Sequence, residues 1–308
     1  MASVHANGIT IEFEITGSGD PLLLIMGLGE QLTTWPDELV AKLVDAGFQV
    51  IRFDNRDIGL SSQSDWEPPS PVRAVASRIV RRKPAAEYEL GDMAADAAGL
   101  LDALGIEAAH VVGVSMGGMI AQTMAIEHPA MVRSLTSIMS NTGDRTHGVV
   151  APSLLPKMAR LTRPVDRERA VERSVEVNAL ISGPEFDADE RRAIAERNVA
   201  RSFRPDAIAR QTAAIMASPD RTEALARVRV PTLVVHGLLD QLVKPSGGIA
   251  TARAIPGSRL VMYPEMGHDL PRSRWDELVG EIRRNADRAI DHNPTDRSPT
   301  DRSVAADS

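Results

Sequence analysis

The sequence feature that most constrains this chain is a serine set among glycines, Gly113-Val114-Ser115-Met116-Gly117-Gly118. Apolar, β-branched residues precede it and a run of helical character follows, so the chain is expected to turn sharply from a buried strand into a helix. Glycine fits both flanks because a Cβ there would crowd the neighbouring backbone. The free N–H groups and positive dipole end of the helix point at the turn. This G-x-S-x-G layout is typical of a nucleophile elbow that exposes a serine hydroxyl.

The same glycines also fit an ordinary βα turn of a doubly wound sheet, with no chemistry at the serine. The surroundings favour the catalytic interpretation. Residues 108–113 are typical of a strand, residues 116–127 are typical of a helix that ends near Pro129, and a suitable acid and histidine follow later in the chain.

Composition excludes several classes of protein. With 308 residues, 43% of them hydrophobic, the chain can bury a sizeable core, and its length favours about two domains. A net charge of −7 argues against a nucleic-acid-binding protein. The chain has no cysteine, which excludes disulfides and thiolate metal sites and fits a reducing compartment. We see no secretory signal and no apolar run long enough to span a bilayer, so we expect a soluble, cytoplasmic protein without stable membrane insertion.

Strand-like and helix-like segments alternate along the chain, and most strand-like segments are apolar throughout. This pattern predicts an α/β fold with a mostly parallel, doubly wound sheet. Between two predicted core strands, residues 141–227 contain only helical stretches, which predicts an inserted helical cap. We therefore expect a first core part over residues 1–140, the cap over 141–227, a second core part over 228–290, and a polar, disordered tail over 291–308.

A basic segment, residues 73–83, lies among prolines and carries apolar residues on one predicted helical face. Such a helix can bind an anionic membrane surface. We favour the simpler interpretation, a surface helix that packs its apolar side on its own protein.

A serine hydroxyl is a weak nucleophile and needs a base that a third group orients. Among the seven histidines, only His268, in the loop after the last predicted strand, is expected at the carboxyl edge of the sheet and downstream of a candidate acid. For that acid we favour Asp240, in a loop at the same sheet edge, with Asp144 as the fallback and Asp269 too close to the base in sequence. His236 precedes the acid and is expected to be a structural residue at the sheet edge.

An oxyanion hole needs two main-chain N–H groups aimed at one oxygen atom. Met116, directly after the serine, is expected to supply one, and Leu28, in the loop after the first central strand, the other. The side chain of Leu28 also fits the role of a hydrophobic plug. We expect an apolar substrate pocket from residues near these loops: Met26, Gly27, Met119 and Met266.

Five segments together resemble the α/β-hydrolase superfamily: Ile25 to Gly29, Arg52 to Ser61, Gly113 to Gly118, His236 to Asp240, and Gly267-His268. Within it the chain is similar to bacterial carboxylesterases and lipases, including aclacinomycin methylesterase and mycobacterial esterase relatives, over about residues 4–288. The resemblance implies a triad of Ser115, Asp240 and His268, an oxyanion hole from Leu28 and Met116, and no cofactor or metal.

Two positions depart from the common pattern of that superfamily. Many relatives have His-Gly where this chain has Met26-Gly27, which changes the side chain beside the expected oxyanion donor. Many also have glycine where Asp57 stands. Anthracycline methylesterase relatives share an Arg-Asp pair here, which implies a related set of substrates.

These observations predict a serine hydrolase that cleaves carboxylic esters of small or medium apolar molecules through an acyl-enzyme on Ser115. A serine at this position argues against dehalogenases and epoxide hydrolases, which use a carboxylate nucleophile. A thioesterase, lactonase or C–C hydrolase on the same residues stays open, because the fold does not separate them. A non-catalytic ligand-binding protein and a homo-oligomer also stay open.

Overall fold

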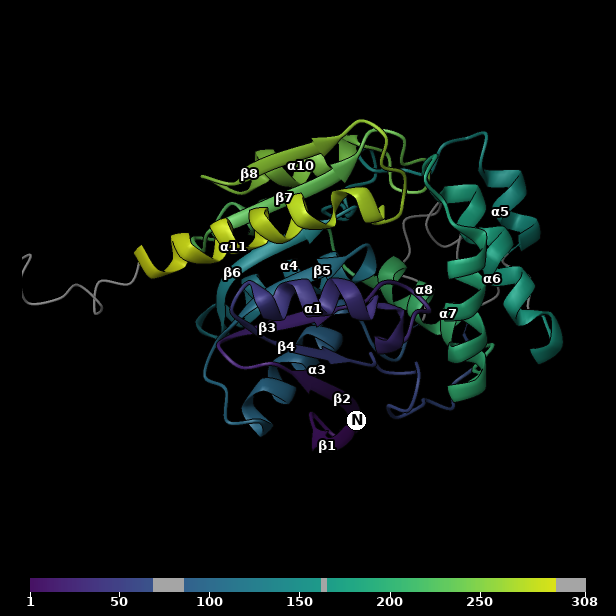
Figure 1. The fold of residues 1–308 in the computed structure, drawn as a ribbon, viewed down its shortest axis with the longest axis horizontal. Helices are drawn as coiled ribbons and strands as arrows, with labels where there is room; N and C mark the ends of the chain where they lie inside the picture. The colour runs from purple at the N-terminus through teal and green to yellow at the C-terminus, as the bar shows by residue number, and fades with distance from the viewer. Residues whose placement is uncertain (69–85, 162–164, 292–308) are drawn as a thin grey trace, which may run out of the picture.

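The computed structural model describes residues 1–68, 86–161 and 165–291, and these contain an eight-stranded sheet (Figure 1). Its spatial order is β1-β2-β4-β3-β5-β6-β7-β8. The pairs β1·β2 and β2·β4 are antiparallel and the others are parallel, which confirms the predicted fold class. The strands are β1 (Ala2–Ala6), β2 (Ile9–Thr16), β3 (Asp20–Ile25), β4 (Phe48–Phe53), β5 (Ala109–Val114), β6 (Val132–Ile138), β7 (Thr232–Gly237) and β8 (Arg259–Tyr263).

Burial explains the position of the central strands. Residues 22–25 of β3 are fully buried, because β4 and β5 pair on either side and helices cover both faces. Strand β1 was not predicted from the sequence. Its signal is Asn7-Gly8, both with positive φ (48° and 77°), which forms a two-residue hairpin turn between β1 and β2.

Helices pack on both faces of the sheet (Figure 1). One face carries α1 (Asp37–Asp45) and α11 (Trp275–Asp291) over an apolar core that includes Trp35 and Leu39. The other carries α3 (Leu90–Ala103), α4 (Met116–Glu127) and α10 (Ser246–Ala254). The sheet is therefore doubly wound, as predicted.

Among the described residues between β6 and β7, five helices occur, and they are called the inserted helices below. They are α5 (Leu155–Leu161), α6 (Arg167–Ile181), α7 (Ala188–Arg201), α8 (Ala207–Ala217) and α9 (Thr222–Leu225). Figure 1 shows α5, α6 and α7 grouped beyond one end of the sheet. The main-chain N–H of His268 donates to the carbonyl of Ile181 at 2.8 Å, so α6 ends against the loop that follows β8.

Two sequence predictions lie on residues that the structure does not describe. The basic segment 73–83 falls outside the described residues, and so does the predicted tail after Asp291, where α11 ends. In the part of the chain that is described, no helix is both long and apolar enough to cross a bilayer.

His110 is a buried histidine in β5, at the sheet edge opposite the elbow. Its Nδ1 lies 2.8 Å from the Ser134 hydroxyl, and its ring meets the edge of Phe48 at 5.9 Å between centroids. Burial lowers the pKa of His110 to about 4, because the charged imidazolium would lose its hydration there. This histidine is therefore neutral in the fold at neutral pH.

The low pKa of His110 predicts acid sensitivity of the fold. Above about pH 6.5 the residue is neutral in both states, whereas between about pH 6.5 and 4 it binds a proton only when unfolded, so stability falls as pH falls. We expect the loss of unfolding free energy between about pH 7.5 and 5 to be about 2 kcal/mol smaller in His110→Asn than in the wild type. Urea unfolding at both pH values measures it, and equal losses in the two proteins would contradict the assignment.

Candidate active site

Ser115 stands at the turn from β5 into α4, in a backbone conformation that only a constrained residue adopts. Its φ is 54° and its ψ is −118°, a left-handed region that costs a non-glycine residue about 1–3 kcal/mol. Hydrogen bonds hold it there. The Ser115 N–H donates to the Ile138 carbonyl at 2.9 Å, and the Ser115 carbonyl accepts from the Met119 N–H at 3.2 Å. These two hydrogen bonds, to β6 and to α4, offset the backbone strain at Ser115.

The three glycines around Ser115 are required by close backbone contacts. A Cβ on Gly113 would lie 2.0 Å from the Gly117 carbonyl oxygen, and one on Gly117 would lie 2.1 Å from the Ile25 carbonyl oxygen. On Gly118 it would lie 2.7 Å from the Ser140 Cβ. The elbow can form only because the first turn of α4 lies directly against the end of β3.

A chain of hydrogen bonds joins Ser115, His268 and Asp240. The Ser115 Oγ lies 2.9 Å from His268 Nε2, and His268 Nδ1 lies 2.7 Å from Asp240 Oδ2. Because a carboxylate only accepts, Nδ1 carries the proton and Nε2 is free to accept from the serine hydroxyl, an assignment that follows from the network. Residues from three separate loops, after β5, β7 and β8, thus meet at the carboxyl edge of the sheet.

The Asp240 carboxylate is held in its ionised form. Burial raises its pKa, but the neighbouring His268, His236 and the Val243 N–H outweigh that effect and lower the pKa to about 2. Its Oδ1 accepts from the N–H groups of Leu242 at 2.9 Å and Val243 at 2.8 Å. The side chain is fully buried, so its negative charge is directed at His268 rather than screened by water.

His236 also contributes to this arrangement, beyond the structural role expected from sequence. It is fully buried, donates from Nε2 to the Val243 carbonyl at 2.7 Å, and places Nε2 3.5 Å from Asp240 Oδ2. The histidine therefore supports the loop that holds the acid. The sequence signal for this contact was that His236 and Asp240 lie four positions apart, at the start of the same loop.

The loop after β3 lies directly beside Ser115. A Cβ on Gly27 would lie 3.4 Å from the Ser115 Cβ. Between described residues, neither the Leu28 N–H nor the Met116 N–H donates a hydrogen bond, and their role as oxyanion donors stays a prediction. The Met26 carbonyl accepts from Asn55 Nδ2 at 3.0 Å, a contact that sequence reasoning missed.

Comparison with known proteins identifies the family. The profile of the α/β hydrolase fold matches residues 20–271, which is most of the chain. The chain belongs to this family. The resemblance seen in the sequence is thereby confirmed.

Relatives of this α/β hydrolase match it over most of their length. The chain is 32% identical over 292 residues to rhodomycin D methylesterase DnrP of Streptomyces peucetius, which covers 86% of this chain and 92% of that protein. It is 30% identical over 299 residues to 2-hydroxymuconate semialdehyde hydrolase of Pseudomonas sp. (strain CF600), which covers 93% of this chain and 94% of that protein. The esterase RhEst1 from Rhodococcus sp. ECU1013 shares the fold, with a TM-score of 0.73 at 22% identity over 92% of this chain and 97% of that one.

The other acids considered from the sequence of this α/β hydrolase have different partners. Asp144 pairs with His147, and Asp269 accepts from the N–H groups of Gly267 at 2.9 Å and Gly183 at 3.2 Å. Asp57, the residue that departs from the common pattern, is buried and accepts from the Tyr88 hydroxyl at 2.6 Å. None of these carboxylates replaces Asp240 at His268 Nδ1 among the described contacts.

Three of the four residues predicted to line a substrate pocket are packed into the core. Met26 and Met266 belong to the apolar cluster on one face of the sheet and Met119 to that on the other. Gly27 lies beside the serine, as described above. Their role in binding a substrate stays a prediction.

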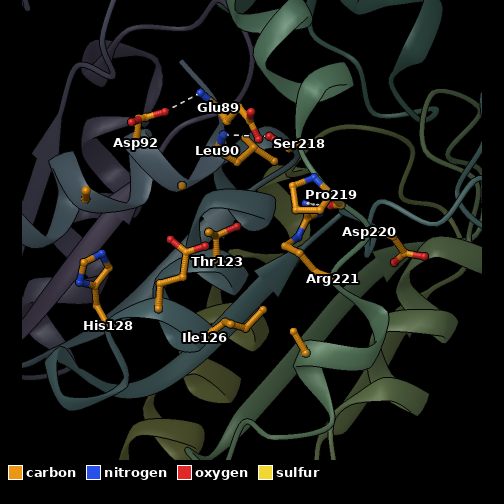
Figure 2. A pocket seen from close by; sticks show the side chains of 14 residues that line it. Glu89, Leu90, Asp92, Thr123, Ile126, His128, Ser218, Pro219, Asp220 and Arg221 are labelled. Atoms are coloured by element: carbon orange, nitrogen blue, oxygen red, sulfur yellow. Dashed lines mark hydrogen bonds between the residues drawn. The ribbon is translucent and has the colours of Figure 1, made fainter. Parts of the chain in front are cut away.

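Two surface clefts lie away from the Ser115 hydroxyl. The cleft in Figure 2, of about 560 Å³, is lined by the start of α3, the end of α4 and residues 218–221. The end of α4 is about 18 Å from Ser115, at about 1.5 Å per helical residue. A second cleft of about 600 Å³ reaches Asp240 from the side of Leu238 and Leu239 but includes neither Ser115 nor His268.

The described residues offer no obvious metal site. No group of three or more histidine or acidic side chains in residues 1–68, 86–161 and 165–291 is arranged to hold a metal ion.

The close contact between Gly117 and Ile25 predicts that alanine at Gly117 and alanine at Gly280, both in helices, change the stability of the protein in opposite directions. Among the described residues, a Cβ added to Gly280 in α11 would meet only the end of Arg284, at 3.6 Å, so Gly280→Ala should stabilise by about 0.5–1 kcal/mol. Gly117→Ala would force a Cβ against a carbonyl oxygen and should destabilise by about 3 kcal/mol. Chemical denaturation of both variants measures the difference, and equal stabilities would refute the steric explanation.

Proposed function

We propose that this α/β hydrolase is a serine esterase that cleaves carboxylic esters of small or medium apolar molecules through an acyl-enzyme on Ser115. The observation that carries the proposal is the hydrogen-bonded chain from Ser115 through His268 to the buried carboxylate of Asp240. A nucleophile, a base and an orienting acid within hydrogen-bond reach are the elements that activate a serine.

The geometry supports a two-step reaction. Ser115 Oγ attacks the ester carbonyl carbon while His268 Nε2 takes the hydroxyl proton, and Asp240 stabilises the imidazolium that results. The tetrahedral oxyanion accepts from the N–H groups of Leu28 and Met116. Its collapse breaks the bond to the alkoxy oxygen, and His268 returns the proton to the leaving alcohol. His268 then deprotonates a water molecule, which attacks the acyl-enzyme. The bond to Ser115 Oγ breaks, His268 returns the proton to that oxygen, and the carboxylic acid is released.

One observation favours an ester. The chain is similar to a protein named as a methylesterase, rhodomycin D methylesterase, over most of both lengths. The apolar character of the substrate is an expectation from the sequence, because Met26 and Met266 themselves pack into the core. The reaction as proposed uses only side chains and main-chain N–H groups of this protein, and needs no cofactor.

A second candidate is hydrolysis of a different bond by the same residues. C–C hydrolysis is the second candidate because the chain is similar to 2-hydroxymuconate semialdehyde hydrolase, whose named substrate is not an ester. Thioesters and lactones present the same carbonyl carbon to Ser115, so they belong to the same test. A panel of esters of varied acyl length, methyl esters, thioesters, lactones and 2-hydroxymuconate semialdehyde separates these substrates by kcat/KM.

Removal of the nucleophile tests the proposal. Ser115→Ala should lower kcat on p-nitrophenyl esters by about 10⁴-fold or more, because it removes the hydroxyl on which the proposed acyl-enzyme forms. A fluorophosphonate probe should label the wild type but not this variant. Ser258→Ala, a serine at the opposite sheet edge, is the matched control and should keep both properties. Turnover and labelling that survive in Ser115→Ala would reject the assignment of Ser115 as nucleophile. A wild type that neither hydrolyses the esters nor reacts with the probe would favour a ligand-binding protein.

Replacement of the acid tests its identity. Asp240→Asn should lower kcat by about 10³- to 10⁴-fold, because the amide no longer favours the tautomer with a proton on Nδ1. Asp144→Asn should leave kcat unchanged, since Asp144 pairs with His147. Steady-state kinetics of both variants decide between the two acids, and a larger loss in Asp144→Asn would overturn the choice of Asp240.

A further inference from the structure

Three consecutive peptide groups around Leu28 have their directions fixed by hydrogen bonds. The Met26 carbonyl accepts from Asn55 Nδ2 at 3.0 Å, the Gly27 carbonyl accepts from the Glu30 N–H at 3.3 Å, and the Gly29 N–H donates to Gln211 Oε1 at 2.9 Å. The N–H of Leu28 belongs to the middle peptide of the three. Its direction is therefore set by the bond to its own peptide carbonyl and by the two flanking peptides.

Gln211 comes from a distant part of the chain, on helix α8. It lies 182 residues from Gly29 in sequence and is fully buried. Its Nε2 donates to the Arg56 carbonyl at 3.0 Å, and only its oxygen can accept from Gly29, so the orientation of the amide is determined at both ends. One side chain thus joins α8 to the loop after β3 and to the loop after β4.

The loop after β3 is shaped to receive α8. Gly29 has a φ of +75°, and a Cβ there would lie 2.7 Å from Ile208 Cγ1, so a side chain at this position would push the helix away. The neighbouring Arg210 donates from Nε to the Trp66 carbonyl at 2.9 Å and places Nη1 3.5 Å from Asp57. Helix α8 is therefore held against these loops by Ile208 and Arg210 as well as by Gln211.

We propose that Gln211 is a positioning residue that sets the direction of the Leu28 N–H in the oxyanion hole. This inference rests on the proposed function, because it assigns to Gln211 a role in the same reaction. Gln211 contacts neither the serine nor the histidine among the described hydrogen bonds. Its effect passes through the main chain of Gly29. Loss of this side chain would weaken the stabilisation of the negative charge that develops on the substrate oxygen.

The experiment replaces the buried amide with an apolar side chain of similar size. Gln211→Met should lower kcat and kcat/KM by about 10- to 100-fold with little change in KM, less than the loss from deleting a donor outright. A trifluoromethyl ketone matched to the acyl group binds as a tetrahedral oxyanion adduct, and its inhibition constant should rise by the same factor. The pH midpoint of kcat/KM should stay unchanged, because the hydrogen bonds of His268 are untouched.

Asn285→Leu is the matched control. This buried amide in α11 donates to the carbonyl of Leu135, in the middle of β6, at 3.0 Å and to that of Pro231, just before β7, at 3.4 Å, and it has no described contact with the loops around Ser115. Its replacement should lower the unfolding free energy by a similar amount yet leave kcat and ketone inhibition unchanged. If Gln211→Met does not fold, Gln211→Asn serves the same purpose, since its side chain is one methylene too short to span both loops.

The outcomes separate this inference from the proposed function. Kinetics and ketone inhibition within twofold of wild type in the folded Gln211 variant would overturn the positioning role while leaving Ser115-dependent hydrolysis standing. An equal loss of kcat in Asn285→Leu would also overturn it, because the effect would then be general destabilisation. Absence of Ser115-dependent turnover in the wild type would instead reject the proposed function.

Discussion

The left-handed backbone of Ser115 depends on how closely three neighbouring segments approach one another. The chain can leave β5 and enter α4 in one residue only if α4 lies against the end of β3, where the Gly117 backbone meets the Ile25 carbonyl. The sheet order β4-β3-β5 makes this contact available, because it places the strand before Leu28 next to the strand before Ser115. One steric constraint thus fixes both the hydroxyl and the loop that faces it.

A buried charge complements this constraint. Asp240 is removed from water, and burial alone would favour its protonated form. Two main-chain N–H groups on Oδ1 and His268 on Oδ2 reverse that preference, with His236 beside them. The negative charge then stabilises whatever positive charge His268 acquires, and it does so in a medium that screens it poorly. The position of the Asp240 carboxylate is therefore fixed by its hydrogen bonds, as that of Ser115 is fixed by close backbone contacts.

Local patterns in the sequence were enough to predict the core of this architecture. The helix over residues 116–127 occurs with the predicted bounds, and the geometry brings Ser115, His268 and Asp240 together as their order implied. The hairpin at Asn7-Gly8 carried a readable signal that was overlooked. Contacts such as Gln211 with Gly29 could not be predicted, because no periodicity links residues 182 positions apart.

The inserted helices hold the edges of the site without supplying any member of the hydrogen-bonded chain. The end of α6 binds the loop of His268, through the Ile181 carbonyl on the His268 N–H and the Gly183 N–H on Asp269. Helix α8 binds the loop of Leu28 through Gln211. Any displacement of these helices would therefore shift the loop of His268 and the loop of Leu28. The positions of these two loops thus depend on a segment that lies between β6 and β7 in the sequence.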